Sequence, residues 1–102
     1  MSKGEVKKRL LRAIEEDPHR KCIKKVSIFG SYAYGRPNKR SDVDILIEFT
    51  PGARVGYFKL FDIQENMRKH LKIKVDLVTR GALDKYIKNE VLANAQTVYQ
   101  KR

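Results

Sequence analysis

Three aspartates and a Gly-Ser pair are the residues of this chain whose types and spacing suit them to chemistry. Asp42 and Asp44 flank a single residue and follow Gly30-Ser31 after ten residues, and Asp76 interrupts a separate apolar run at 73–78. Carboxylate oxygens are the ligands that hard cations such as Mg²⁺ prefer, and such ions usually keep bonds to substrate phosphates. Two ions about 4 Å apart can stabilise both the attacking and the leaving oxygen of an in-line displacement. The three aspartates are therefore candidate catalytic and metal-binding residues.

The alternation of side chains along strands predicts how these carboxylates are positioned. Residues 43–49 are strongly β-prone, so Asp42 and Asp44 point to one face and Val43 to the other. In the run 73–78, Asp76 lies on the face opposite the apolar majority. If the two strands are neighbours, the three aspartates meet on an open face. An acidic solvent-facing strand is the alternative, but carboxylates that start a strand directly after a loop favour a binding site.

The Gly-Ser pair suggests a phosphate-binding turn. Glycine permits a tight turn and a close approach of backbone to ligand. Ser31 is suited to cap a short helix over 32–34 that ends at Gly35, and a helix N-terminus favours an anion. Gly30 and Ser31 are thus candidate nucleotide-binding residues. An ordinary turn with a capping serine is the alternative.

The net charge of +11 favours partners that are polyanions. It is uneven, because residues 1–40 hold 12 Lys and Arg against 4 Asp and Glu. Arg36, Lys39 and Arg40 lie between the Gly-Ser pair and the aspartates, where they either contact a triphosphate or are merely solvated. Nucleic-acid binding is expected to be weak, because no aromatic platform for stacking bases is evident.

The remaining patterns predict one domain over residues 1–102 with alternating helices and strands, hence an α+β or α/β fold. A helix begins at a Ser2/Glu5 capping box and stops at Pro18, and a strand follows at 23–29. Two more helices are expected, with apolar stripes at Leu60, Ile63, Met67 and Leu71, and at Leu83, Ile87, Val91 and Ala95. The single cysteine, Cys22, favours the cytoplasm, and no apolar run is long enough for a membrane span.

The chain resembles the minimal nucleotidyltransferase (MNT) family of the DNA polymerase beta-like superfamily. The resemblance rests on Phe29-Gly30-Ser31-Tyr32-Ala33-Tyr34-Gly35 and on Ser41-Asp42-Val43-Asp44. It implies an α+β nucleotidyltransferase fold, a small mixed sheet with helices packed on one face. It also implies two Mg²⁺ ions bound at Asp42, Asp44 and Asp76, with ATP as the substrate. Many members carry Arg where Tyr34 stands, so a role of that arginine does not carry over.

Two classes of function follow. The resemblance implies an enzyme that transfers AMP to a hydroxyl of a macromolecule, as the antitoxin of a helical HEPN-type toxin. The short chain supports an external acceptor, because it leaves no room for a separate acceptor-binding domain. The alternative is a binding module with a vestigial nucleotide site, either an occluding antitoxin or a basic nucleic-acid binder.

Overall fold

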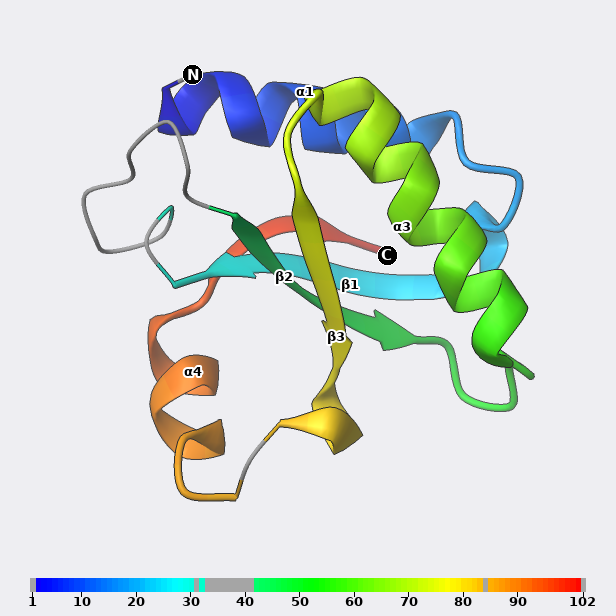
Figure 1. The fold of residues 1–102 in the computed structure, drawn as a ribbon. Helices are drawn as coiled ribbons and strands as arrows, with labels where there is room; N and C mark the ends of the chain where they lie inside the picture. The colour runs from blue at the N-terminus through cyan, green and yellow to red at the C-terminus, as the bar shows by residue number, and fades with distance from the viewer. Residues whose placement is uncertain (1, 31, 33–41, 84, 102) are drawn as a thin grey trace.

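A mixed sheet lies at the centre of the computed structural model, which describes residues 2–30, 32, 42–83 and 85–101. Within these residues, four strands pair in the order β3-β2-β1-β4 (Figure 1). β1 (Ile23–Phe29) follows the 3₁₀ turn η1 (Arg20–Cys22) and is antiparallel to both β2 (Val43–Phe49) and β4 (Gln96–Gln100). β2 is parallel to β3 (Val75–Thr79). The predicted α+β architecture is confirmed.

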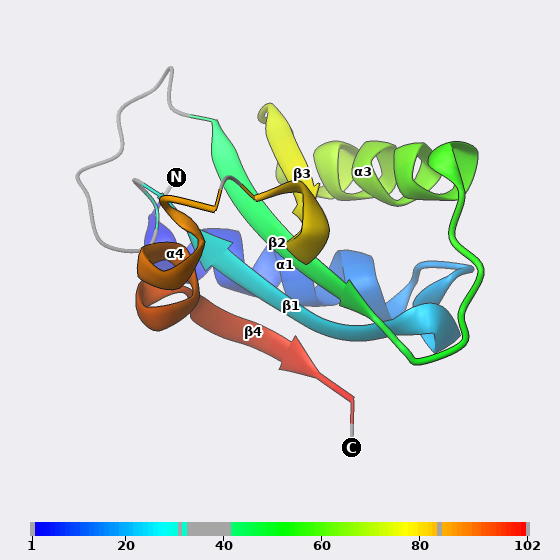
Figure 2. The same ribbon diagram turned by 90° about the horizontal axis from the view of Figure 1, so that it is seen from below.

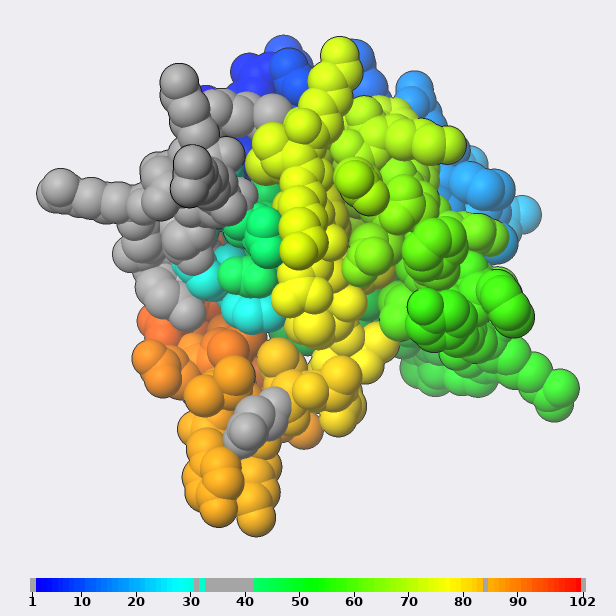
Figure 3. Space-filling view, in the orientation of Figure 1, coloured from blue at the N-terminus to red at the C-terminus, as the bar shows by residue number. Residues whose placement is uncertain are grey.

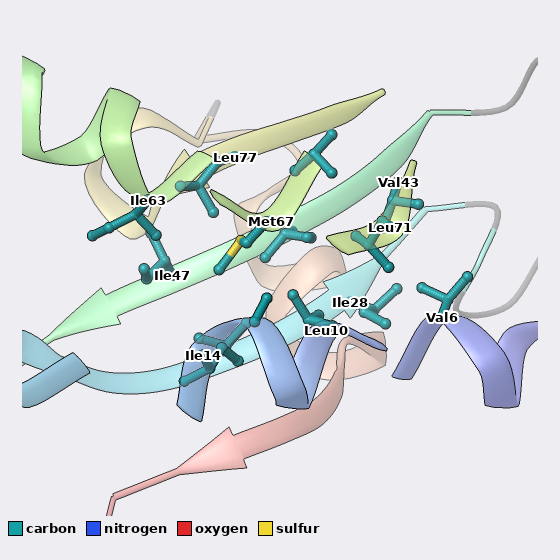
Figure 4. Packing of buried hydrophobic residues seen from close by; sticks show 14 of the residues in the cluster. Val6, Leu10, Ile14, Ile28, Val43, Ile47, Ile63, Met67, Leu71 and Leu77 are labelled. Atoms are coloured by element: carbon teal, nitrogen blue, oxygen red, sulfur yellow. The ribbon is translucent and has the colours of Figure 1, made fainter. Parts of the chain in front are cut away.

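Helices α1 (Lys3–Glu15) and α3 (Tyr57–Leu71) pack side by side on one face of this sheet. α1 begins as predicted, since Ser2 Oγ accepts a hydrogen bond from the Glu5 amide at 3.1 Å. α3 is the crossover that parallel strands require between β2 and β3. Figure 4 shows the core that the two helices and the sheet enclose, built from residues that include Leu10, Ile14, Ile28, Ile47, Ile63, Met67 and Leu77.

The opposite face of the sheet is partly covered by the segment that follows β3. In Figure 2, η2 (Arg80–Ala82) and α4 (Lys88–Asn94) lie in front of the strands and α1 lies behind them. Leu46 shares its face with the aspartates, yet it is only 2% exposed. The face that the sequence predicted to be open is therefore closed around Leu46, whereas Asp76 near its end remains exposed.

The C-terminal third differs from its predicted form. A helix with Leu83, Ile87, Val91 and Ala95 on one side was expected, but α4 spans only residues 88–94 and Ala95 is already extended. The strand β4 that follows was not expected. Its residues Thr97, Val98 and Tyr99 favour a strand, and pairing with the free edge of β1 decides the outcome because it satisfies backbone groups of both strands. None of the described helices combines the length and apolar character needed to cross a membrane.

A polar cluster fastens the end of α1 to α3. Asn66 Nδ2 donates to the Ala13 carbonyl at 2.9 Å and to the buried Asp17 carboxylate at 3.1 Å. His70 contacts the Asn66 carbonyl through Nδ1 at 2.9 Å and the Glu16 carboxylate through Nε2 at 2.7 Å. The Asn66 carbonyl, followed by Glu16, raises the pKa of His70 above its ordinary value of 6.5. The cluster therefore holds the imidazolium form more tightly in the folded protein than in the unfolded chain.

This cluster predicts a pH-dependent stability. The pKa of His70 is raised on folding, so its protonation adds to the free energy of unfolding. This contribution is fully present below about pH 6.5 and is lost as the pH rises through the pKa of His70 in the folded protein. Urea denaturation should show that the wild type exceeds His70→Gln in free energy of unfolding at about pH 5.5. The difference should shrink at about pH 8.5. A difference that stays constant between the two pH values would show that His70 acts by packing alone.

Candidate active site

Parallel pairing of β2 and β3 brings two of the predicted aspartates side by side. Asp44 and Asp76 are direct partners in the register, with Val43 opposite Val75 before them. The backbone bond from Val43 N to Lys74 O, at 3.0 Å, starts this pairing. Asp42 lies immediately before β2 and is two residues from Asp44, which places it on the same side of the chain. The predicted neighbourhood of the two strands, with Asp44 beside Asp76, is therefore the one that the structure shows.

Gly30 lies against Asp44 on the side opposite β3. Phe29, the last residue of β1, pairs with Asp44, so Gly30 follows directly beside that carboxylate. Gly30 has φ of +73°, a left-handed backbone that disfavours other residues. A Cβ at this position would collide with Asp44 Oδ2 and would lie 3.2 Å from its Cγ. Two independent constraints, backbone conformation and space, therefore select glycine here.

Crowding of like charges changes the acidity of Asp44. Burial raises the pKa of this carboxyl above its ordinary value, and the charges of Asp76 and then Asp42 raise it further. All three effects disfavour the ionised form of Asp44 in the folded protein. Perturbation of this kind is frequent at functional sites because such sites concentrate like charges for a ligand to neutralise. A bound cation would relieve the repulsion.

The three aspartates are chemically suited to a hard divalent cation, although their carboxylates do not converge on one point in this structure. Among the described residues, no three His, Cys, Asp or Glu side chains are grouped closely enough to hold an ion. Asp42 Oδ2 instead lies 3.9 Å from Lys74 Nζ, and both side chains are well exposed, at 42% and 76%. Exposed pairs of this kind contribute little, so losing the contact with Lys74 costs little, and a bound cation would offset the repulsion between Asp42 and Asp44. Three carboxylates supply the oxygen ligands that Mg²⁺ prefers.

Several predicted site residues lie outside the described part of the chain. These are Ser31, with the short helix expected after it, and the basic loop residues Arg36, Lys39 and Arg40. Their proposed contacts with a nucleotide remain predictions. Tyr32, which is described, is 4% exposed and belongs to the main core, so it anchors the chain just after Gly30.

Two charged contacts near the aspartates were not anticipated. Lys74 is two residues from Asp76 and therefore shares its face, but its approach to Asp42 depends on the register between β2 and β3. Arg80 Nη1 lies 3.5 Å from Glu48 Oε1, farther along the face that carries Asp44. Such contacts join residues far apart in the sequence, so only the strand order and register reveal them.

Comparisons with known proteins agree with this geometry. The Nucleotidyltransferase domain family matches residues 7–98. A Methanocaldococcus jannaschii relative, named as a candidate protein adenylyltransferase, is 43% identical over 72 residues, which are 68% of this chain and 69% of that protein.

Solved structures show the same fold. A candidate minimal nucleotidyltransferase has a TM-score of 0.77 at 24% identity, covering 93% of this chain and 94% of that one. A chain from a tri-AMPylated Shewanella oneidensis HEPN toxin in complex with MNT antitoxin has a TM-score of 0.67 at 14% identity. This match covers 97% of the present chain and 73% of the other. The predicted resemblance is confirmed, and the chain belongs to the nucleotidyltransferase domain family.

Proposed function

We propose that this nucleotidyltransferase transfers AMP from ATP, with Mg²⁺, to a hydroxyl group of a protein. The observation that carries the proposal is the placement of Asp44 beside Asp76 by β2–β3 pairing, with Gly30 packed against Asp44. The names of the relatives support a protein acceptor.

In the proposed reaction, the acceptor oxygen attacks the α-phosphorus of ATP. A new oxygen–phosphorus bond forms, the bond to the bridging oxygen breaks, and pyrophosphate leaves with that electron pair. The acceptor proton passes to Asp76, the most exposed of the three carboxylates and the one best placed to meet an incoming group. Asp42 and Asp44 would hold the cation, which when bound neutralises triphosphate charge. Gly30 and Ser31 would lie against the departing phosphates.

The acceptor that we propose is a tyrosine of a helical HEPN-type toxin, with this protein as its antitoxin. The solved complex of an AMPylated HEPN toxin with an MNT antitoxin supports this assignment. A tyrosine hydroxyl, with an ordinary pKa near 10, is a competent nucleophile once its deprotonation is assisted. We propose the cytoplasm as the compartment, in keeping with a single half-buried cysteine.

Asp44→Asn should separate ligand binding from stability. The substitution removes a charge whose ionised form is disfavoured by burial and by Asp76, so urea denaturation at neutral pH should give a higher free energy of unfolding. Calorimetry with Mg-ATP should show binding weakened by at least about a hundredfold. Asp62→Asn, at an exposed position of α3, is the matched control and should alter neither quantity appreciably. Equal Mg-ATP binding by Asp44→Asn and the wild type would contradict the assignment.

Gly30→Ala tests the packing against Asp44, and Gly52→Ala is its control. Both glycines have positive φ, +73° and +81°, so alanine at either position carries a similar backbone cost of about 1 kcal/mol. A Cβ meets Asp44 at position 30 but nothing within 4 Å at position 52. Thermal unfolding should therefore show both variants destabilised. Only Gly30→Ala should lose Mg-ATP binding, and retention of full binding in that variant would rule out the proposed role of Gly30.

The transfer itself is tested with the protein encoded beside this chain, co-expressed and purified with it. Intact-mass spectrometry should find the partner heavier by one or more AMP groups with the wild type. It should be unmodified with the double variant Asp42→Asn/Asp44→Asn. A partner that is unmodified in both preparations and still inhibited would favour an occluding antitoxin and contradict the enzymatic proposal.

A further inference from the structure

Positive charge is concentrated where α1 meets the C-terminal end of α3. Two cavities, of about 360 Å³ and about 340 Å³, open at this corner and share Lys72. Figure 3 shows the corner at the top of the view, where the end of α3 and the start of β3 project beside α1. Lysines and arginines line both cavities, and we name as the basic band six of them: Lys8, Arg9, Arg12, Arg68, Lys72 and Lys74.

Lys72 occupies a backbone conformation that ordinarily selects glycine. It caps α3 with φ of 59° and ψ of 23°, and its amide donates to the Arg68 carbonyl at 2.7 Å. It is the only non-glycine residue with positive φ in the described part of the chain. Glycine is the usual residue at such a cap because a side chain is disfavoured there. A lysine at the junction of two basic cavities therefore indicates a use for its side chain.

The basic band leads directly to the aspartates. Lys74, at its end, lies 3.9 Å from Asp42 and one residue before β3, which carries Asp76. A ligand that lies along the band and extends past Lys74 therefore comes up to Asp42. The band is therefore placed to contact an acceptor molecule whose hydroxyl reaches the aspartates.

We propose that the basic band binds an acidic segment of the acceptor protein and directs its hydroxyl toward Asp76. The acceptor role rests on the proposed function, whereas binding to the band does not depend on catalysis. Arg9 and Arg68 already pair with Glu5 and Glu65, at 3.0 and 3.7 Å. Lys8, Arg12 and Lys72 make no ion pair within the described residues, so their charges are available to carboxylates of a partner.

The composition of the band favours a protein over a nucleic acid. Glu5 lines one cavity and Glu65 the other, so each cavity carries one carboxylate beside its cations, and a uniformly charged phosphate backbone lying along the whole band would meet both carboxylates, whereas a peptide can place neutral residues opposite them. Single-stranded nucleic acids are usually bound with aromatic platforms that stack bases. Among the described residues, the exposed aromatic side chains Tyr57, Phe58, Phe61 and Tyr86 lie outside the cavity linings.

Lys72→Gly tests the proposal because the variant suits the left-handed cap better than the wild type does. The probe is a short fluorescein-labelled peptide with a central tyrosine between glutamates, and its match carries glutamines instead. Fluorescence anisotropy without nucleotide or divalent ion should detect binding of the acidic peptide by the wild type. The affinity should fall steeply between about 0.05 M and about 0.3 M salt.

Combining Lys72→Gly with Arg12→Gln should weaken the acidic peptide about fivefold, as expected for two exposed ion pairs. The thermal midpoint of Lys72→Gly alone should equal or exceed that of the wild type. Lys24→Gln, at an exposed position of β1 outside the band, should bind as the wild type does. Unchanged peptide binding in the double variant, or tighter binding of a single-stranded RNA of similar length, would overturn the proposal. Peptide binding without AMP transfer would contradict only the proposed function.

Discussion

The β2–β3 parallel ladder places two carboxylates on neighbouring strands, and the rest of the structure accommodates that arrangement. Asp44 and Asp76 are register partners, so their charges repel wherever the strands pair. Partial burial and a third carboxylate, Asp42, add to the cost and raise the pKa of Asp44. Like charges opposite each other destabilise a sheet. Such a pairing persists because the apolar faces of both strands pack into the main core.

The crossover helix α3 is the element that compensates for this repulsion. Its buried residues Ile63, Met67 and Leu71 hold β2 and β3 from one face, and Gln64 Oε1 accepts from the Leu77 amide at 3.2 Å. That bond satisfies a backbone donor of β3, the edge strand of the sheet. Asn66 and His70 on the same helix fasten it to the end of α1. Helix α3 therefore positions the site, although none of the three aspartates belongs to that helix.

The sequence was most informative where a local rule determines the outcome. Strand alternation predicted the shared face of Asp44 and Asp76, which the strand register confirms, and the Ser2 cap and the apolar stripe of α3 located both large helices. It was least informative where contacts between distant segments decide. β4 forms because β1 offers a free edge, and Leu46 is buried because residues after β3 return across that face. The approach of Lys74 to Asp42 and the left-handed cap at Lys72 likewise depend on tertiary structure.

We propose above all that Asp42 and Asp44 hold a cation beside Gly30, with Asp76 next to them on the paired strand. A crystal structure with Mn²⁺ and a nonhydrolysable ATP analogue would test it most directly, because anomalous scattering locates the ion independently of the protein. We expect Mn²⁺ bound by Asp42 and Asp44, alone or together with Asp76, and phosphates of the analogue beside Gly30. Mn²⁺ and nucleotide bound elsewhere on the protein, with these carboxylates free of the ion, would contradict it.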